Sequence, residues 1–279
     1  MKINYINKNE KSIRDFLGFF HLGKAKIYNL LQNNQLSING NIVKNDISIN
    51  SGDVISIEYN EEIDYKASNN DIDILYEDDY FLIVNKKSGI IIHDEKNSLC
   101  NDIAKYYLDN DINLSVKFPN RIDKETSGIM IFCKDMLTHS YMNYLFENHE
   151  IEKEYIAFIH GKLKNKKGAI TYRIGRDRHD SSKMRVSSTG LESYTKYEVI
   201  KEYDNYSKVR CVIKTGRTHQ IRVHMSYIGN PIIGDKLYGN DNYNNMALHA
   251  YRVDFIHPVI KKRIEIKCKL PEYMEELEI

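Results

Sequence analysis

Three short segments of the 279-residue chain bring together residue types that could do chemistry. The first segment, 120–128, holds Asp123, an acid in a polar turn just before the apolar run 129–132. A carboxylate that is kept charged in an enclosed site can act as a nucleophile or as a general base. The residue types alone favour a plainer role for Asp123, that of a turn acid that hydrogen-bonds to its own backbone.

The second segment, 153–161, places a tyrosine in an alternating apolar run. Tyr155 shares one face of the predicted strand with Ala157 and Ile159. This alternation favours a core tyrosine whose hydroxyl has found a hydrogen-bond partner.

The third segment, 214–225, predicts a helix that Thr218 could cap, with Ile221 and Met225 on its apolar side. Arg222 lies one position off that apolar line, at the border between core and solvent. A guanidinium group at such a border can reach inward to a carboxylate.

The histidines and cysteines do not form a metal-binding pattern. His219 and His224 are five residues apart, whereas two zinc-binding histidines on one helix face are four apart, so we expect both to be structural hydrogen-bonding groups. The four cysteines are widely separated and predict reduced thiols of a cytosolic protein. The sequence also lacks both common Gly-rich phosphate loops.

The elements that must position these segments lie in residues 74–279. Strand candidates such as Tyr80–Val84, Gly89–His93 and Tyr155–His160 outnumber the helices, and only some connections are helical. We therefore expect an α+β fold on a large mixed, mostly antiparallel sheet with flanking helices. The predicted helices are Leu99–Leu108, Thr138–Asn148 and Thr218–Tyr227.

Residues 1–60 predict a small separate domain. A helix that we expect to end at Gly23 is followed by a second helix and by short strands joined through Asn39-Gly40. This dipeptide is typical of a tight hairpin because both turn residues need positive φ. Residues 61–73 are acidic, lack periodicity and predict a linker.

The charge of the chain is unevenly distributed. The total of 40 Lys and Arg against 39 Asp and Glu, a net charge of +1, first argues against a nucleic-acid partner. Residues 161–225, however, hold sixteen Lys and Arg and only six acids. Such a sustained excess fits a surface that neutralises phosphates. No apolar run approaches the roughly 18 residues that a membrane span needs, so we expect no membrane partner.

Motifs spread from residue 74 to about residue 270 resemble the RluA-type pseudouridine synthase family. Each motif alone is weak, but their order and spacing make the resemblance specific. They are Asn85–His93, Arg121–Gly128, Lys153–Ala157, Thr215–His224, Gly229–Asp235, Leu248–Ala250 and His257-Pro258.

The resemblance implies isomerisation of uridine in RNA, in which the base detaches through nitrogen 1, turns and rejoins the ribose through carbon 5. The family uses no cofactor or metal and one essential aspartate, which corresponds to Asp123. Arg222 is expected to pair with Asp123 and keep it oriented and charged, and Tyr155 is expected to stack on the uracil. Arg121 is expected to fill the space left by the extruded target nucleotide.

Three positions and the stretch Gly190–Ser193 depart from the usual pattern of the family. Asn120 stands where histidine is frequent, Ile122 replaces leucine, and Lys87 replaces proline. None of them is a residue to which the resemblance gives a role, so we expect activity to be retained.

Residues 11–59 resemble the alpha-L RNA-binding module first known from ribosomal protein S-four, through Arg14–Leu17, Ser37–Gly40 and Gly52–Ile55. In that family the helix pair and its basic residues face RNA. The alternative for this module is a packing cap on the larger domain. The module makes large-subunit ribosomal RNA the expected substrate, with transfer RNA second.

The predicted function is therefore that of an RNA pseudouridine synthase, a cytoplasmic isomerase that we expect to be a monomer. The alternative from another class is a catalytically inactive RNA-binding or ribosome-assembly factor on the same fold. The presence of Asp123, Tyr155 and Arg222 argues against that alternative. A metal-dependent hydrolase is disfavoured because the ten histidines make no ligand set.

Overall fold

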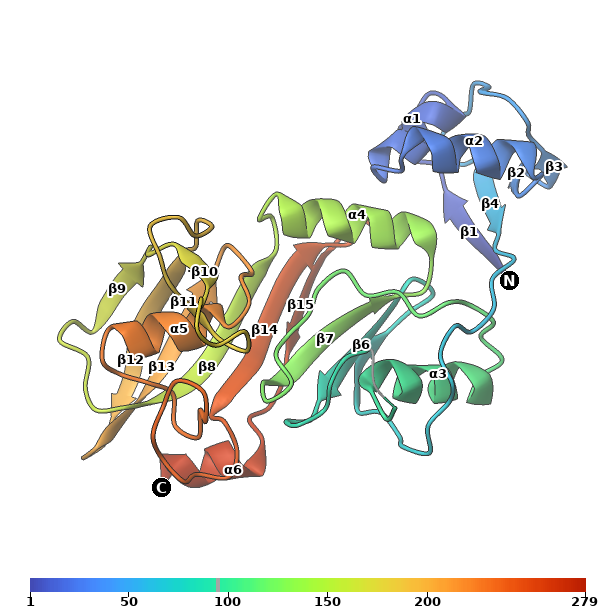
Figure 1. Cartoon of the computed structure of the whole chain (residues 1–279). Coiled ribbons are helices and arrows are strands. Elements are labelled where there is room, and N and C mark those ends of the chain that lie inside the picture. Colours follow the sequence, from blue (N-terminus) through green and yellow to red (C-terminus); the bar gives the residue numbers. More distant parts are fainter. Residues whose placement is uncertain (94–95) are drawn as a thin grey trace.

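The computed structural model of the chain describes residues 1–93 and 96–279 (Figure 1). Within these residues the strands form a small N-terminal sheet, a two-stranded hairpin and one large sheet. No helix in this part of the chain is long and apolar enough to cross a membrane.

The N-terminal sheet has four antiparallel strands in the order β1-β4-β2-β3, and two helices accompany it (Figure 1). The first strand, which the sequence pattern did not predict, pairs with the last, and Ile3 and Tyr5 alternate into the core. The elements are β1 (Lys2–Ile6), α1 (Ile13–Phe19), α2 (Lys24–Gln32), β2 (Leu36–Ile38), β3 (Asn41–Ile42) and β4 (Val54–Glu58).

Two turns of this sheet and its helices test the local predictions. The hairpin at Asn39-Gly40 is confirmed, with φ angles of 48° and 85°. The prediction that Gly23 ends the first helix is wrong: α1 ends at Phe19, His21 takes a left-handed φ of 55°, and Gly23 is the N-cap of α2. An imidazole ring therefore projects from a left-handed position directly after α1.

Residues 61–73 contain no helix or strand, and they lie against the larger domain. Ser68 Oγ donates to Asp102 Oδ1 at 2.6 Å, and Ser115 Oγ donates to Glu61 Oε2 at 2.8 Å. One cluster of buried apolar side chains contains both Leu17 of the N-terminal part and Leu82 of the larger domain, so the two parts share a core. The domain boundaries at residues 60 and 73 stay predictions.

The large sheet runs in the order β5-β6-β7-β14-β8-β13-β12-β9, with β15 paired to β14. All of its pairs are antiparallel except β7 with β14, so the expected mixed, mostly antiparallel sheet of an α+β fold is confirmed. Its strands are β5 (Ile74–Glu77), β6 (Phe81–Lys86), β7 (Ser127–Cys133), β8 (Glu152–His160), β9 (Lys167–Ile170), β12 (Thr195–Glu202), β13 (Tyr206–Ile213), β14 (Leu248–Ile256) and β15 (Arg263–Lys267).

Four α-helices and one hairpin flank this sheet in the described residues. In Figure 1, α3 lies beside β6 and β7, whereas α5 and the hairpin lie beside β12 and β13. The predicted helices correspond to α3, α4 and α5. The elements are α3 (Leu99–Asp109), α4 (Met136–Glu147), the hairpin strands β10 (Ile174–Arg176) and β11 (Met184–Val186), α5 (Gln220–Tyr227), α6 (Glu272–Glu275) and the short 3₁₀ helix η1 (Glu276–Glu278).

Candidate active site

The three segments that hold the candidate reactive residues meet at one open cavity of about 880 Å³. Its lining includes every residue to which the family resemblance assigns a role. These residues are Arg121, Asp123, Tyr155 and Arg222. Residues separated by up to about a hundred positions are thus brought to one place by the pairing of β7, β14 and β8.

Asp123 lies in the turn that enters β7, and its side chain is 21% exposed. The turn closes through Thr126, whose N–H donates to the Asp123 carbonyl at 3.1 Å. It is braced from the segment after β6, because Gly89 N–H and Lys86 Nζ donate to the Lys124 carbonyl at 2.9 and 2.8 Å. The prediction of a strand over Gly89–His93 is wrong. This segment hydrogen-bonds to the Asp123 turn and does not pair in the sheet.

Lys86 is a buried support for the same turn. Its ammonium donates to three backbone carbonyls, those of Lys87, Ile90 and Lys124. Burial lowers the pKa of Lys86 to about 7, against the opposing effect of the Glu125 and Asp123 charges. The sequence pattern gave Lys86 no role, although it lies in one of the quoted motifs.

Arg222, on α5, joins two carboxylates. Its Nη1 donates to Asp123 Oδ2 at 3.2 Å, while Nε and Nη2 donate to the two oxygens of Asp235 at 2.8 and 2.9 Å. The side chains of Arg222 and Asp235 are 2% and 0% exposed. Although burial opposes it, hydrogen bonds and charge from Asp235 and Asp123 raise the pKa of Arg222 above its usual value, so the guanidinium is cationic. The expected pairing of Asp123 with Arg222 is present.

Asp235 is the main residue of the site that the sequence reasoning missed. Besides Arg222, its Oδ1 accepts hydrogen bonds from the backbone N–H groups of Leu237 and Tyr238, at 3.0 and 3.1 Å. The bidentate geometry fixes the plane of the guanidinium, and with it the direction of Nη1. The available signal was the position of this acid at the end of the Gly229–Asp235 motif.

Tyr238 was also missed, and it links three elements around the guanidinium. Its ring centre lies 5.2 Å from the Arg222 guanidinium carbon, and its hydroxyl lies 2.8 Å from His219 Nδ1. The same hydroxyl accepts from the N–H of Met184 on β11, also at 2.8 Å. His219 thus makes the structural hydrogen bond expected of it, and it also lines the cavity.

The start of α5 differs from the expected Thr218 cap. The N-cap is His219, in a left-handed conformation with φ of 56°. No side chain caps this end of the helix, and Gln220 Oε1 instead fixes the preceding turn by accepting from Arg217 N–H at 3.1 Å and from Thr215 Oγ1 at 2.7 Å. His224 is buried, with Nδ1 2.9 Å from Thr195 Oγ1, as expected for a structural histidine.

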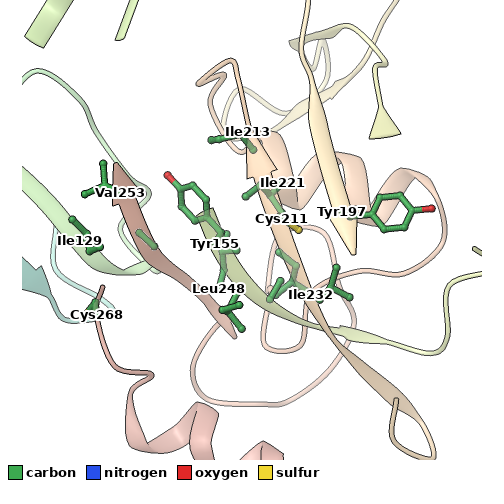
Figure 2. Close-up of a cluster of buried hydrophobic side chains, with 14 of the residues drawn as sticks. Ile129, Tyr155, Tyr197, Cys211, Ile213, Ile221, Ile232, Leu248, Val253 and Cys268 are labelled. Atoms are coloured by element: carbon green, nitrogen blue, oxygen red, sulfur yellow. The ribbon is translucent and has the colours of Figure 1, made fainter. Parts of the chain in front are cut away.

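Tyr155 forms an apolar wall of the cavity from β8. It is 9% exposed and belongs to the core cluster shown in Figure 2, where Ile213, Ile221 and Leu248 surround it. All three of these apolar neighbours also line the cavity. Burial, reinforced by the charge of Asp123, raises the pKa of Tyr155 above its usual value, so the hydroxyl is neutral. The ring thus belongs to the core cluster, as expected, and also lines the cavity.

The lining of the cavity contains several basic side chains beside the exposed acids Glu125 and Glu147. Arg121 is exposed there, and Arg217 and Lys153 line the same opening. Burial and the positive charge of Arg217 lower the pKa of Lys153 to about 8. Among the described residues, no group of three or more His, Cys, Asp or Glu side chains is placed to hold a metal ion.

The whole chain was compared with known proteins. The family profile for RNA pseudouridylate synthase matches residues 80–227, more than half of the chain and the part that holds Asp123, Tyr155 and Arg222. The chain belongs to the RNA pseudouridylate synthase family. It is of the RluA type and is an RNA pseudouridine synthase, an isomerase that acts on RNA.

Individual relatives agree with this membership along nearly the full length. The chain is 34% identical over 266 residues to the uncharacterized RNA pseudouridine synthase YlyB of Bacillus subtilis, covering 91% of this chain and 88% of the relative. It is 30% identical to ribosomal large subunit pseudouridine synthase D of Buchnera aphidicola, covering 86% and 83% of the two chains. Among solved structures, human RNA pseudouridylate synthase domain containing 1 matches with a TM-score of 0.64 at 26% identity, covering 74% of this chain and 86% of that one.

Proposed function

We propose that this synthase isomerises specific uridines in large-subunit ribosomal RNA, with Asp123 as the catalytic group. The observation that carries the assignment is the Asp123–Arg222 contact of 3.2 Å at the wall of the cavity. A buried, permanently charged guanidinium holds this carboxylate in a fixed orientation, as a nucleophile or a general base requires. Transfer RNA is the second substrate that we consider.

The other residues divide the remaining tasks. Tyr155 presents an apolar ring on which the detached uracil stacks while it turns from nitrogen 1 to carbon 5. Arg121, exposed at the rim, fills the space that the extruded nucleotide leaves in the RNA. Arg222 positions Asp123 and contributes no separate chemical step.

Two features support ribosomal RNA as the substrate. Relatives from Buchnera aphidicola, Xylella fastidiosa and Vibrio vulnificus carry the name ribosomal large subunit pseudouridine synthase D. The excess of positive charge in residues 161–225 includes the exposed arginines of the β10–β11 hairpin, beside α5. This distribution suits contacts to many phosphates of a large RNA. We further propose a monomeric, cytoplasmic enzyme that needs no cofactor.

Two measurements test this proposal. Purified protein is expected to release tritium from ribosomal RNA labelled at carbon 5 of uracil, without added metal or nucleotide. Pseudouridine mapping of total RNA from cells with and without the gene is expected to show the loss of particular sites in large-subunit ribosomal RNA. Loss of sites only in transfer RNA would make transfer RNA the substrate. Absence of tritium release from every RNA would overturn the proposed activity.

A further inference from the structure

Helix α4 contacts the N-terminal module, residues 1–60, at one end and the cavity at the other. Its N-cap, Asp135, accepts from Leu137 N–H at 2.7 Å and also from the Tyr59 hydroxyl of the module at 3.4 Å. At the far end of the helix, Phe146 and Glu147 line the cavity. Helix α4 therefore touches both the module and the cavity.

Stacked rings join the module to the middle of α4. The ring of His21, in the left-handed position after α1, lies 3.5 Å from that of Tyr144 with an interplanar angle of 6°. Phe19 stacks on Tyr141 at 5.3 Å, and Ser140 Oγ donates to the His21 carbonyl at 2.9 Å. Offset and stacked ring pairs are directional contacts, so they restrict rotation as well as separation.

A second set of contacts holds the module from other segments of the larger domain. Lys261 Nζ lies 3.1 Å from the centre of the Phe19 ring, and Lys8 Nζ donates to the Ile260 carbonyl at 3.2 Å. Tyr80 OH donates to the Asn4 carbonyl at 2.7 Å. Contacts from segments near residues 80, 140 and 260 cannot all be kept during a hinge motion, so the module is fixed in three directions.

Helix α2 of the module carries exposed residues of the types that contact RNA. Lys24, Lys26 and Tyr28 are all exposed on α2, and Tyr28 keeps 63% of its surface accessible. Lysines supply phosphate contacts and an exposed aromatic ring supplies a stacking platform for a base.

Helix α4 carries polar and aromatic residues between the module and the cavity. Burial lowers the pKa of His139 on this helix against a hydrogen bond to the Phe118 backbone, and the positive charges of Lys117 and Lys26 lower it further. His139 lies 3.4 Å from Asn143 along the helix, and Phe146 follows on the same face. No acidic side chain lies on α4 before Glu147.

We infer that the module and the cavity form one rigid unit that binds RNA at two places, and that the contacts of the module with α4 hold the two places together. The partner is a folded RNA that offers a phosphate-rich element to α2 while its target uridine occupies the Asp123 cavity, at a separation fixed by these contacts. The enzyme then selects uridines by their distance from a second structural element of the RNA. This inference rests on the proposed function, because the occupant of the cavity is taken to be the target uridine.

The rigidity is tested directly by pulsed electron spin resonance on the full chain. Nitroxide labels are attached at Ile42→Cys in the module and at Ile200→Cys on β12, two exposed positions outside the contacts described above. The four native cysteines are buried and stay unlabelled. We expect one narrow distance distribution without RNA, and a broad distribution would overturn the inference.

A loosened module tests the functional consequence. Phe19→Leu with His21→Asn removes the stacked rings, keeps apolar volume in the core and retains a residue that tolerates the left-handed conformation. The double variant is expected to broaden the distance distribution and to lose at least about tenfold in kcat/KM on intact ribosomal RNA, because the two contacts no longer act at a fixed separation. On a short stem-loop carrying the mapped uridine, its kcat/KM is expected to equal that of the wild type. Unchanged turnover on intact ribosomal RNA would overturn the inference.

Charge reversal on α2 tests the proposed contact with RNA. Lys24→Glu with Lys26→Glu is expected to weaken binding of ribosomal RNA. The slope of the logarithm of the binding constant against the logarithm of the salt concentration should fall by the amount that about two phosphate contacts contribute. The matched control is Lys267→Glu with Lys269→Glu, because Lys269 lies with Glu154 and Ile156 on the sheet face opposite Tyr155. Equal effects of the two pairs would exclude a specific surface on α2. Failure of the proposed function is distinguishable, since the wild type would then release no tritium from either RNA, whatever the distance distribution.

Discussion

Arg222 Nη1 donates to Asp123 Oδ2 at 3.2 Å while the other edge of the same guanidinium is locked by Asp235. The catalytic carboxylate of the proposed mechanism is therefore oriented by a cation whose own position is determined by a second, fully buried carboxylate. This arrangement separates two roles that a single ion pair would combine. Asp123 keeps one side accessible to the cavity, and Asp235 holds the guanidinium in place.

Asp123→Asn is expected to lower the rate of tritium release by at least about a thousandfold, while the affinity for RNA is retained. The amide has the shape of the carboxylate and its oxygen still accepts from Arg222, but it is neither a nucleophile nor a base at neutral pH. Tritium release and a filter-binding assay on the same preparation measure the two effects. Full activity of the variant would refute the catalytic assignment.

Arg222→Met is expected to reduce turnover far more than affinity for RNA, because the buried guanidinium orients Asp123 and is not placed to grip phosphates. The free energy of unfolding should also fall by about 3 kcal/mol, since Asp235 is left as a buried charge without its cation. Arg222→Lys keeps the charge but not the bidentate geometry, and should recover stability better than turnover. A variant that weakened only RNA binding would contradict the pairing argument.

Asp235→Asn is expected to lower kcat by about ten- to a hundredfold with little change in KM, because the guanidinium loses the partner that sets its direction. The matched control is Asp254→Asn, a buried aspartate that accepts from Arg252 and Arg263 outside the cavity. Both variants should lose thermal stability, and only Asp235→Asn should lose turnover. Equal losses of kcat would show that the effect comes from general destabilisation.

Gly128→Ala is expected to destabilise the fold by about 3 kcal/mol or more. Gly128 has a φ of +107°, and a Cβ there would overlap the Ala250 backbone, 2.8 Å from its nitrogen, where β7 pairs with β14 behind the Asp123 turn. Gly18→Ala in α1 has open space and a helical backbone, and should be neutral or stabilising by up to about 1 kcal/mol. Urea unfolding of both variants gives the comparison, and a neutral Gly128→Ala would show that the two strands can separate without cost.

His249→Gln is expected to flatten the dependence of stability on pH. His249 is buried beside Ser127 on β7, and burial lowers its pKa from 6.5 to about 4. Between these two values the unfolded chain binds a proton that the folded chain does not, so the contribution of His249 to stability falls as the pH falls from 6.5 towards 4.

The expected loss between pH 7 and pH 5 is about 2 kcal/mol for this one group. The same comparison in the His249→Gln variant removes the other buried histidines from the result, because they titrate in both proteins. Urea unfolding at the two pH values measures it. An equal pH dependence in both proteins would show that His249 titrates normally in the folded state.

Much of the site was predictable because local chemistry leaves clear patterns. A polar turn before an apolar strand placed Asp123, and helical periodicity placed Arg222 at the inner edge of α5. The hairpin at Asn39-Gly40 followed from two residues that tolerate positive φ. The errors occurred where a distant contact overrides a local preference. The helix expected to begin at Thr218 begins after the left-handed His219, where Gln220 ties down the preceding turn, and bracing of the Asp123 turn displaces the predicted strand Gly89–His93.

The sequence by itself determined the family, the α+β class and the four residues proposed for the reaction, because the order of motifs and the periodicity of apolar residues can be read directly from the linear sequence. Only the tertiary structure decided that Asp235 holds the guanidinium and that the N-terminal module is packed against α4. Such facts depend on which of many carboxylates and rings come together after the strands have paired. Periodicity shows which face of an element is buried, whereas the partner that buries it is chosen by the packing of the whole chain.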